Sequence, residues 1–379
     1  MTTSNSREAT QTPYLLLEEA KIKKNVASLY DHINKLGCYV RPHLKTLRSL
    51  QAASLLLKDL SSPATVSTLA EAEAFASAGY LDLLYAVGIE PHKLDRVIEL
   101  SKNGATIHIL LDSVTQAKAV VECAAEREFQ FSAFIEIDCD GHRGGILPDN
   151  ALLLEIGRIL ESGGVSVTGV LTHAGESYHC QTQAEIQKAA RNECLAALTA
   201  ARHLREAGIR CPVVSVGSTP TAHRVDDLSG ITEVRAGVFS TFDLFMKNVG
   251  VCTTEDIAIS VVTTVIGHNL EKRWLFVDAG WMALSRDRGT ASQVEDYGYG
   301  LVCDMEGKPL NYTVASVSQE HGIVILPEDD KCGPENFPLG TRLRILPNHA
   351  CATASMHDVY RVKQNDEVDL QLWDRIRGW

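Results

Sequence analysis

The sequence predicts a fold in two parts, a parallel (β/α)8 barrel followed by a mainly antiparallel β domain. From Tyr14 to about Gly237, short apolar runs alternate about eight times with longer amphipathic segments, which favours a parallel sheet covered by helices. After about Leu244 the chain changes to β-rich runs separated by turns. A doubly wound open sheet is the alternative, but no Gly-x-Gly-x-x-Gly follows the first strand.

The elements follow in chain order. We expect the barrel at residues 13–245 and the β domain at 246–379, with residues 1–12 flexible or joined to the β domain. The predicted barrel strands are Tyr14–Leu17, Tyr39–Arg41, Ala64–Ser67, Asp82–Val87, Thr106–Leu111, Ser132–Asp138, Val165–Thr172, Val213–Gly217 and Thr232–Arg235. The predicted helices are Lys21–Leu36, Leu47–Leu57, Leu69–Ala78, His92–Lys102, Val114–Arg127, Asp149–Ser162, Gln183–Ala207 and Thr221–Leu228. The predicted strands of the β domain are Ile257–Ile266, Trp274–Val277, Val314–Gln319, Gly322–Leu326, Thr341–Ile345 and Asp358–Val362.

The composition is that of a globular protein with an acidic balance. The 379 residues are 45% hydrophobic and 22% charged, and 36 basic against 48 acidic side chains give a formal net charge of -12. This charge argues against nucleic acid or an anionic membrane as the partner. The N-terminus resembles no signal peptide, and no run reaches the roughly 18 apolar residues of a membrane span. The ten cysteines include no Cys-x-x-Cys pair, so we expect reduced thiols and a cytoplasmic protein.

The most informative segment is Arg41-Pro-His-Leu-Lys-Thr46, which lies where a strand turns into a helix. Lys45 lies beside Arg41 and His43, with no acid nearer than Asp59. Cationic neighbours and partial burial favour a neutral amine, which is the form that attacks a carbonyl. A basic loop that binds a phosphate or stays solvated is the alternative interpretation.

A second segment on the same rim is Gly217-Ser-Thr-Pro-Thr221. Glycine permits close approach of the backbone, and hydroxyl and N–H groups suit a phosphate, which late βα loops of barrels often bind. The alternative is a helix cap with proline in the first turn. The segment Arg235-Ala-Gly-Val-Phe239 adds further backbone N–H groups. A nucleophilic lysine and a phosphate site on one rim suggest pyridoxal phosphate, bound as a Schiff base.

Five motifs in order resemble those of the fold-type III pyridoxal phosphate enzymes, within them the D-serine dehydratase and D-threonine aldolase family. The motifs are Arg41-Pro-His-Leu-Lys-Thr46, Glu136-Ile-Asp-Cys-Asp-Gly-His-Arg-Gly-Gly145, Thr172-His-Ala-Gly-Glu-Ser-Tyr178, Gly217-Ser-Thr-Pro-Thr221 and Pro347-Asn-His-Ala-Cys351. The resemblance runs from about Pro13 to Trp379. It implies an alanine-racemase-like barrel with a β domain, in agreement with the pattern of elements.

The resemblance also implies a role for each matching residue. Lys45 is expected to hold the cofactor and, once released, to remove the Cα proton of the substrate. Arg235 resembles the arginine that faces the pyridine nitrogen, with His173 behind it, and Arg143 contacts either the ring or the substrate carboxylate. The remaining residues expected to contact the cofactor are Tyr178, and Ser218, Thr219, Gly237 and Val238 at its phosphate.

The segment His349-Ala-Cys351 is the candidate metal site. Two ligands at i and i+2 of an extended segment point to the same side, and imidazole plus thiolate suit zinc. Taken alone, the pair also fits a core cysteine beside a turn histidine. The family context favours a divalent metal, Zn²⁺ first with Mn²⁺ or Mg²⁺ as alternatives, whose Lewis acidity helps the β-hydroxyl to leave.

Together these expectations describe a dehydratase of D-3-hydroxy amino acids that depends on pyridoxal phosphate and a divalent metal. D-threo-3-hydroxyaspartate would give oxaloacetate and D-serine would give pyruvate, each with ammonia. Arg41 and His43 are further candidates for binding the substrate. An aldolase of the D-threonine type and an amino-acid racemase are the alternatives, and a non-enzymatic cofactor-binding protein is a third, which the β domain after Leu244 disfavours. A small D-amino acid is the expected partner, with no nucleic acid and no membrane, and the expected assembly is a homodimer.

Overall fold

The computed structural model describes residues 11–141, 143–364 and 369–379, and the chain forms two compact units. One unit comprises Ala27–Gly237 and Ile376–Trp379. The other comprises the chain up to Val26 together with Val238–Arg375. Each unit is built around a sheet of its own.

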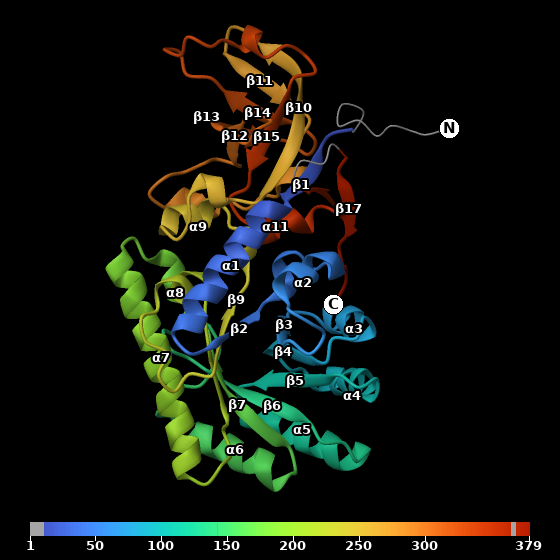
Figure 1. Ribbon diagram of the computed structural model, residues 1–379, viewed down its shortest axis with the longest axis vertical. Coiled ribbons are helices and arrows are strands. Elements are labelled where there is room, and N and C mark those ends of the chain that lie inside the picture. Colours follow the sequence, from blue (N-terminus) through green and yellow to red (C-terminus); the bar gives the residue numbers. More distant parts are fainter. Residues whose placement is uncertain (1–10, 142, 365–368) are drawn as a thin grey trace. The chain divides into compact units, whose positions relative to one another are not determined.

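The first unit is the expected parallel barrel (Figure 1). Its eight strands pair in parallel in the order β2-β9-β8-β7-β6-β5-β4-β3, and a parallel bridge between His43 and Thr65 joins the two ends of the sheet. The strands are β2 (Tyr39–Pro42), β3 (Ala64–Val66), β4 (Asp82–Gly88), β5 (Thr106–Leu111), β6 (Ser132–Ile137), β7 (Ser166–Thr172), β8 (Val213–Val216) and β9 (Glu233–Ala236). The predicted (β/α)8 class is therefore confirmed.

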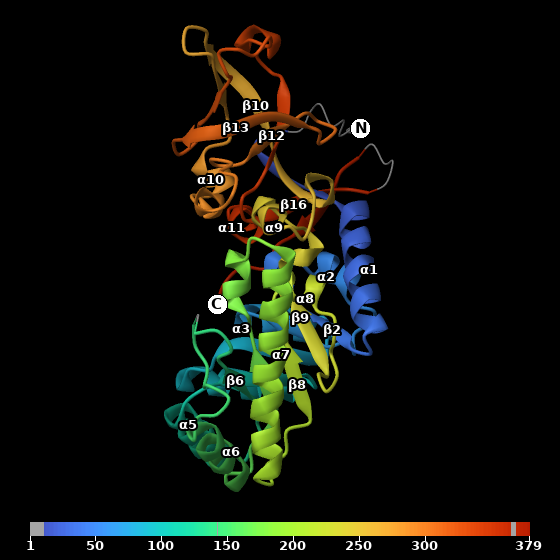
Figure 2. The same ribbon diagram turned by 90° about the vertical axis from the view of Figure 1, so that its left-hand side faces the viewer.

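Helices connect these strands and cover the outside of the barrel, with the long α7 beside β7 and β8 (Figure 2). They are α1 (Glu19–Lys35), α2 (Leu50–Leu56), α3 (Leu69–Ser77), α4 (Leu94–Lys102), α5 (Val114–Arg127), α6 (Leu152–Ser162), α7 (Gln183–Glu206) and α8 (Thr219–Arg224). Capping explains several starts: Thr68 and Glu71 form a capping box at α3, and Thr182 and Glu185 form one at α7. None of the helices in the described part of the chain combines the length and apolar character that a membrane span requires.

The interior of the barrel contains both apolar and polar side chains. Leu84, Leu110, Phe134 and Leu171 form a buried cluster across β4 to β7. Side chains two apart on a strand point to the same face, and on β9 these are Glu233 and Arg235, both buried. The interior therefore also holds charged groups, which need partners within the barrel.

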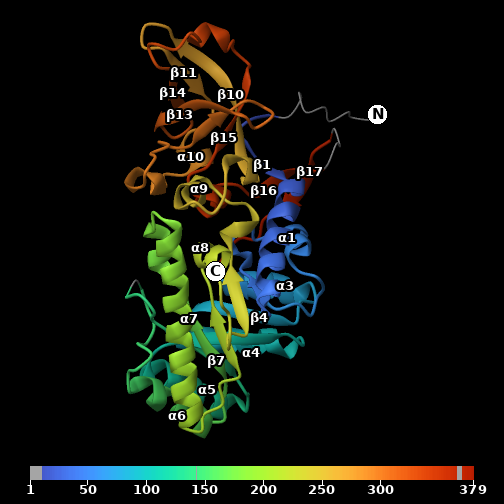
Figure 3. The ribbon, with the colours of Figure 1, turned by 60° about the vertical axis from the view of Figure 1, so that its left-hand side comes forward.

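The second unit contains a nine-stranded sheet in the order β11-β14-β13-β12-β15-β10-β1-β16-β17 (Figure 3). Because β11 also pairs with β10, the six strands from β11 to β10 in this order form a closed ring. The strands are β1 (Tyr14–Glu18), β10 (Ile259–Asn269), β11 (Trp274–Val277), β12 (Leu301–Cys303), β13 (Pro309–Val317), β14 (Gly322–Ile325), β15 (Arg342–Leu346), β16 (Val359–Lys363) and β17 (Gln371–Asp374). Three short helices belong to this unit: α9 (Leu244–Val249), α10 (Trp281–Leu284) and α11 (Ala350–Ser355).

The placement of the first strand corrects the expectation from sequence. The segment Tyr14–Leu17 was predicted as a barrel strand, but β1 pairs antiparallel with β10 and parallel with β16. The compact units accordingly divide at Val26 and Gly237, whereas the predicted barrel spans 13–245. A strand followed directly by a helix has the same local pattern as a βα unit of the barrel. That pattern does not show which distant strands the first strand pairs with. Of residues 1–12, for which we predicted flexibility or attachment to the β domain, residues 1–10 lie outside the described part.

Candidate active site

Lys45 lies at the C-terminal end of β2, on the short 3₁₀ helix Leu44–Thr46. His43 caps this helix, since its Nδ1 accepts from the backbone N–H of Lys45 at 3.5 Å. The backbone N–H of His43 donates to the carbonyl of Ala236 at 2.7 Å, which ties the ends of β2 and β9 together. Lys45 is exposed although its neighbours Leu44 and Thr46 are buried, so the turn is packed while the amine stays accessible.

The neighbours of Lys45 include two histidines, His43 and His173, and Arg235. His173, which follows β7, contacts the carbonyl of Gly217 through Nδ1 at 2.9 Å. Burial lowers the pKa of His173 to about 3 and that of His43 well below its usual range, and the charges of Lys45 and Arg235 act in the same direction. Both imidazoles are therefore neutral near pH 7. They are polar groups beside Lys45 that add no positive charge.

Arg235 is held rigidly inside the barrel. It is buried, and its guanidinium donates to Ser215 Oγ at 2.7 Å and to the carbonyl of Thr172 at 2.5 Å. Burial lowers its pKa to about 10, with Glu233 opposing that shift, so the group remains charged at neutral pH. A fixed cation on β9 fits the role expected of an arginine at the pyridine nitrogen.

Arg143 differs from Arg235 in every respect that bears on this role. It follows β6 in a loop, its side chain is 62% exposed, and it lies 3.7 Å from the carboxylate of Glu136. Burial raises the pKa of Glu136, while Arg143 opposes that shift. Arg143 is therefore the more adaptable of the two arginines and the better candidate for contacting a substrate.

The predicted phosphate loop begins at Gly217, between β8 and α8. A Cβ at Gly217 would lie 2.0 Å from the carbonyl oxygen of Arg235, and its φ of +138° is one that L side chains rarely adopt. Ser218 caps α8 by accepting from the N–H of Thr221 at 3.3 Å. Within the described chain, the buried Thr219 Oγ1 has no hydrogen-bond partner. An unpaired buried hydroxyl in this loop fits the binding of a phosphate oxygen.

The other expected cofactor residues lie at neighbouring strand ends. Gly237 directly follows β9 and approaches His43, and Val238 is the next residue of the chain. Tyr178 lies on the 3₁₀ helix Gly175–His179 after β7, with its ring centroid 6.0 Å from that of His173. The structure thus brings the lysine, the arginine and the phosphate loop to one rim of the barrel, as the motifs indicated.

Arg41 does not have the orientation that a substrate ligand requires. Its Nε donates to Glu233 at 2.8 Å, and its terminal nitrogens donate to Asp82 at 2.6 and 3.4 Å and to the carbonyl of Ala64 at 3.3 Å. The side chain is buried among these acceptors inside the barrel. The expectation that Arg41 binds substrate is therefore contradicted, because strand alternation turns this residue inward. His43 keeps its place beside Lys45.

The candidate metal ligands His349 and Cys351 lie in the second unit, at the start of α11. The expected extended segment is wrong: His349 is extended, but it caps α11 and Cys351 is already helical. The two side chains are nevertheless close enough to hydrogen bond. Among the described residues, no group of three or more His, Cys, Asp or Glu side chains could hold a metal ion. A metal bound by this pair would therefore keep positions open to other ligands.

Asp287, which contacts His349, has no sequence motif and was not predicted. His349 Nδ1 contacts Asp287 Oδ2 at 2.7 Å, which leaves Nε2 of the ring to coordinate a metal. Burial opposes protonation of His349, but its hydrogen bonds to Asp287 and Cys351 raise its pKa to about 11, so a metal ion that binds Nε2 would have to displace a proton from it. Such a carboxylate–histidine arrangement, beside a thiol, has the donor chemistry of a zinc site.

The comparisons with known proteins agree with this architecture. The family model "Alanine racemase, N-terminal domain" matches residues 17–244, and the model "Putative serine dehydratase domain" matches residues 258–363. The chain therefore belongs to the family of pyridoxal phosphate enzymes that join an alanine-racemase-like barrel to a serine dehydratase domain.

Comparison with individual relatives indicates where this chain lies within that family. The chain is 46% identical to a D-threo-3-hydroxyaspartate dehydratase from Delftia sp. over 97% of this chain and 98% of that protein. A solved cysteine-to-alanine variant of a D-threo-3-hydroxyaspartate dehydratase, in its metal-free form, superposes with a TM-score of 0.96 at 45% identity, covering 99% of this chain and 100% of that one. An alanine racemase-like protein from Idiomarina loihiensis reaches a TM-score of 0.95 at 56% identity, covering 98% of each chain.

More distant relatives include both dehydratases and aldolases. A D-serine dehydratase from Dictyostelium discoideum is 28% identical over 97% of each chain. A 3-hydroxy-D-aspartate aldolase from Paracoccus denitrificans is 26% identical over 95% of this chain and 90% of that protein. The chain thus lies closer to the dehydratases than to the aldolases.

Proposed function

We propose that this enzyme is a dehydratase that converts D-threo-3-hydroxyaspartate to oxaloacetate and ammonia, and that also accepts D-serine, giving pyruvate and ammonia. The main support is the full-length similarity to D-threo-3-hydroxyaspartate dehydratase at 46% identity. The exposed lysine at the end of β2 supports the same chemistry, because barrel enzymes place reacting groups at this rim.

In this proposal the residues of the barrel bind the cofactor and move one proton. Bound pyridoxal phosphate supplies an electron sink for the substrate's Cα. Lys45 holds the cofactor and then acts through its Nζ as the general base at Cα. Arg235, which stays charged, would interact with the ring nitrogen. The hydroxyls of Ser218 and Thr219 hold the phosphate with the backbone groups of Gly237 and Val238, and Tyr178 contacts the cofactor beside His173.

His349 Nε2 and Cys351 Sγ are the proposed metal ligands, and Asp287 orients the histidine ring. A bound divalent ion supplies Lewis acidity for departure of the β-hydroxyl. The imidazole–thiolate pair favours Zn²⁺ over Mn²⁺ or Mg²⁺, because thiolates are soft ligands. A solved relative is a cysteine-to-alanine variant in a metal-free form, which supports a cysteine as metal ligand.

The second carboxylate of hydroxyaspartate requires a cation or a hydrogen-bond donor. With Arg41 paired inside the barrel, Arg143 is the remaining arginine that we predicted for this role, and His43 is the other residue that we predicted for it. We extend the proposal to a homodimer that acts in the cytoplasm. Light scattering of the purified protein tests the dimer, and metal analysis of the same sample tests the ion.

A substrate panel tests the proposed reaction. Purified enzyme is incubated with D-threo-3-hydroxyaspartate, D-serine and D-threonine, with and without a chelator, and ammonia and 2-oxo acid are measured. We expect release of both products, fastest from hydroxyaspartate, with loss on chelation and recovery on adding Zn²⁺. Activity that is insensitive to chelation would contradict the role of His349 and Cys351.

A further inference from the structure

Glu193 is a buried carboxyl in the middle of α7 that none of the roles above uses. It is 1% exposed, and it lies on the apolar stripe of the helix between Ala190 and Ala197, both buried. Burying an unpaired carboxyl is costly, so its partners have to explain its presence. Burial raises the pKa of Glu193, and its hydrogen bonds oppose that shift.

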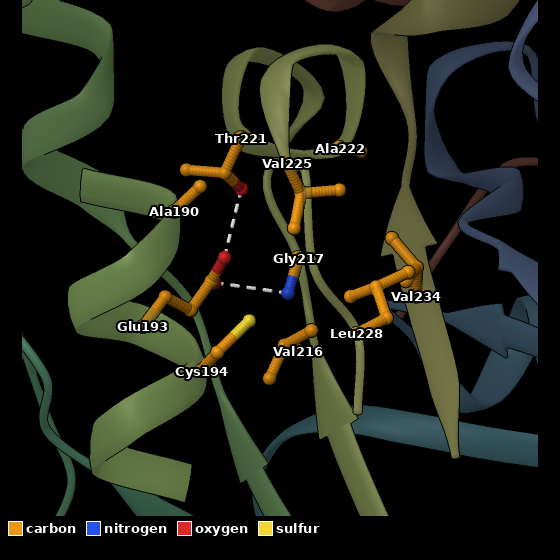
Figure 4. Close-up of a pocket in the computed structure, with 10 residues that line it drawn as sticks. All are labelled: Ala190, Glu193, Cys194, Val216, Gly217, Thr221, Ala222, Val225, Leu228 and Val234. Atoms are coloured by element: carbon orange, nitrogen blue, oxygen red, sulfur yellow. Dashed lines mark hydrogen bonds between the residues drawn. The ribbon is translucent and has the colours of Figure 1, made fainter. Parts of the chain in front are cut away.

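Those partners come from three separate segments of the site. Glu193 Oε1 accepts from the backbone N–H of Ala174 and from that of Gly217, each at 2.9 Å. Glu193 Oε2 accepts from Thr221 Oγ1 at 2.8 Å. Figure 4 shows the carboxyl pointing from α7 toward Gly217 and Thr221. One side chain therefore joins the loop after β7, the loop after β8 and the first turn of α8.

The space beside the carboxyl has little room for a water molecule that could replace the carboxyl as a hydrogen-bond acceptor. A cavity of about 10 Å³ lies there, lined by Glu193 and mainly apolar side chains such as Cys194 and Val234 (Figure 4). That volume is at the lower limit for a single water molecule. Removing the carboxyl would therefore leave the N–H groups of Gly217 and Ala174 without an acceptor at this place, and the hydroxyl of Thr221 would keep the carbonyl of Ser218, at 3.3 Å.

The contacts continue from Glu193 to the hydroxyl expected to bind phosphate. Thr221 Oγ1 accepts from the backbone N–H of Ser218 at 3.0 Å. Ser218 Oγ lies 2.8 Å from Ser177 Oγ, which itself donates to the carbonyl of Ala174. The position of Ser218 thus depends on the same three segments that Glu193 joins.

We propose that Glu193 is a positioning residue that holds the loop of Gly217, Ser218 and Thr219 in the shape that binds the cofactor phosphate. It does not contact the cofactor in this proposal. It acts through the backbone of Gly217 and the side chain of Thr221. The inference rests on the proposed function, because it takes this loop as the site of the cofactor's phosphate.

Binding of two cofactor forms by the apoenzyme tests this role. Pyridoxal phosphate and pyridoxal differ only in the phosphate, and both binding constants are measured by cofactor absorbance. Glu193→Met keeps a similar volume and removes the acceptors, and we expect at least a tenfold loss of affinity for pyridoxal phosphate with less than a twofold change for pyridoxal. Glu193→Gln retains an acceptor for the two N–H groups, so we expect it to recover most of the affinity.

The control lies on the same helix. Glu185 also accepts from two backbone N–H groups, those of Gln181 and Thr182, but it caps α7 and is exposed. Glu185→Gln should leave both binding constants unchanged. If Glu193→Met does not fold, Thr221→Val removes one of the three bonds and should lower the affinity for pyridoxal phosphate selectively, by about threefold or more.

Equal weakening of both ligands, or no change in either, would overturn the role of Glu193. A wild-type protein that binds pyridoxal phosphate no better than pyridoxal would instead overturn the assignment of the phosphate loop, and with it the proposed function. The two failures are therefore distinguished before any variant is compared.

Discussion

At the scale of single residues, the surroundings of Lys45 differ from those the motif alone indicates. Of the basic residues close to it in sequence, Arg41 turns into the barrel and His43 is neutral, while the fixed charge nearby is Arg235 on a strand 190 residues later. The accessible amine therefore has polar neutral neighbours and one buried cation.

Replacement of Lys45 is the direct test of its role. We expect Lys45→Ala to lower kcat by about 10²- to 10⁴-fold or more, since a general base and the attachment of the cofactor are lost together. Borohydride reduction of the wild-type holoenzyme should label the peptide that contains Lys45. Lys58→Ala, at an exposed lysine, is the control. An active Lys45→Ala enzyme would exclude this lysine.

The charged network inside the barrel predicts a pH dependence of stability. Burial raises the pKa of Asp82, but hydrogen bonds from His108 and Arg41 outweigh it and lower the pKa to about 2. An unfolded aspartate titrates near pH 3.9, so the folded state binds fewer protons and the ionised group stabilises the fold above about pH 4. This contribution disappears as the pH falls toward 2.

We therefore expect Asp82→Asn to lower the free energy of unfolding at pH 7 by about 1 kcal/mol, a small value because the side chain of Asp82 is partly exposed. The difference from wild type should shrink between pH 4 and pH 2 in urea titrations. A difference that stays constant over this range would contradict the assigned ion pair.

At the scale of elements, the two proposed metal ligands lie at the start of α11. His349 is extended and occupies the N-cap position of the helix without a capping hydrogen bond from its side chain. Cys351 lies in the first turn, and Asp243 accepts from the N–H of Ala350 between them at 2.8 Å. The geometry thus comes from a helix cap rather than from strand alternation. Asp287 then fixes the orientation of the ring through Nδ1.

Substitution of Asp287 should weaken metal binding without removing a ligand. We expect Asp287→Asn to lower the affinity for Zn²⁺ by about 10- to 100-fold, measured in the absence of substrate by competition with a chelating dye. Asp296→Asn is the matched control, because Asp296 pairs with Arg288 at the surface of the same segment. Equal affinities in the two variants would argue against Asp287 as the residue that orients His349.

At the scale of the whole molecule, the first strand of the chain, β1, belongs to the sheet of the second unit. Leu15 is fully buried in β1, opposite Val261 on β10 and Tyr360 on β16. The second unit therefore depends on the N-terminal segment as well as on the C-terminal half of the chain.

Truncation of Leu15 measures this dependence. We expect Leu15→Ala to lower the free energy of unfolding of the second unit by about 2–5 kcal/mol, as for other buried leucines. Tryptophan fluorescence reports mainly on this unit, which contains Trp274, Trp281 and Trp373, whereas Trp379 belongs to the other unit and is 84% exposed. Leu152→Ala on α6, at a side chain that is 45% exposed, should change stability by less than about 0.5 kcal/mol. Similar effects of both substitutions would contradict the central place of β1.

These residues show which features of the fold and of the candidate site could be predicted from the sequence. Alternating apolar and amphipathic segments predict the barrel, and motifs at strand ends predict which residues share its rim. The strand Tyr14–Glu18 was misplaced because pairing with β10 and β16 depends on contacts about 240 and 350 residues away. Asp287 lies 62 residues from His349 and has no motif of its own. Glu193 did leave a signal, a charged residue on an apolar helical stripe, which indicates a buried partner.

The most direct test of the central claim is the product formed from D-threo-3-hydroxyaspartate. Elimination predicts oxaloacetate and ammonia in equal amounts, with no glycine. Cleavage between Cα and Cβ would instead give glycine and glyoxylate. Quantifying all four products in a single reaction of the metal-loaded holoenzyme separates the two reactions. Stoichiometric oxaloacetate and ammonia would establish the dehydratase, and glycine with glyoxylate as the main products would show that the enzyme is an aldolase.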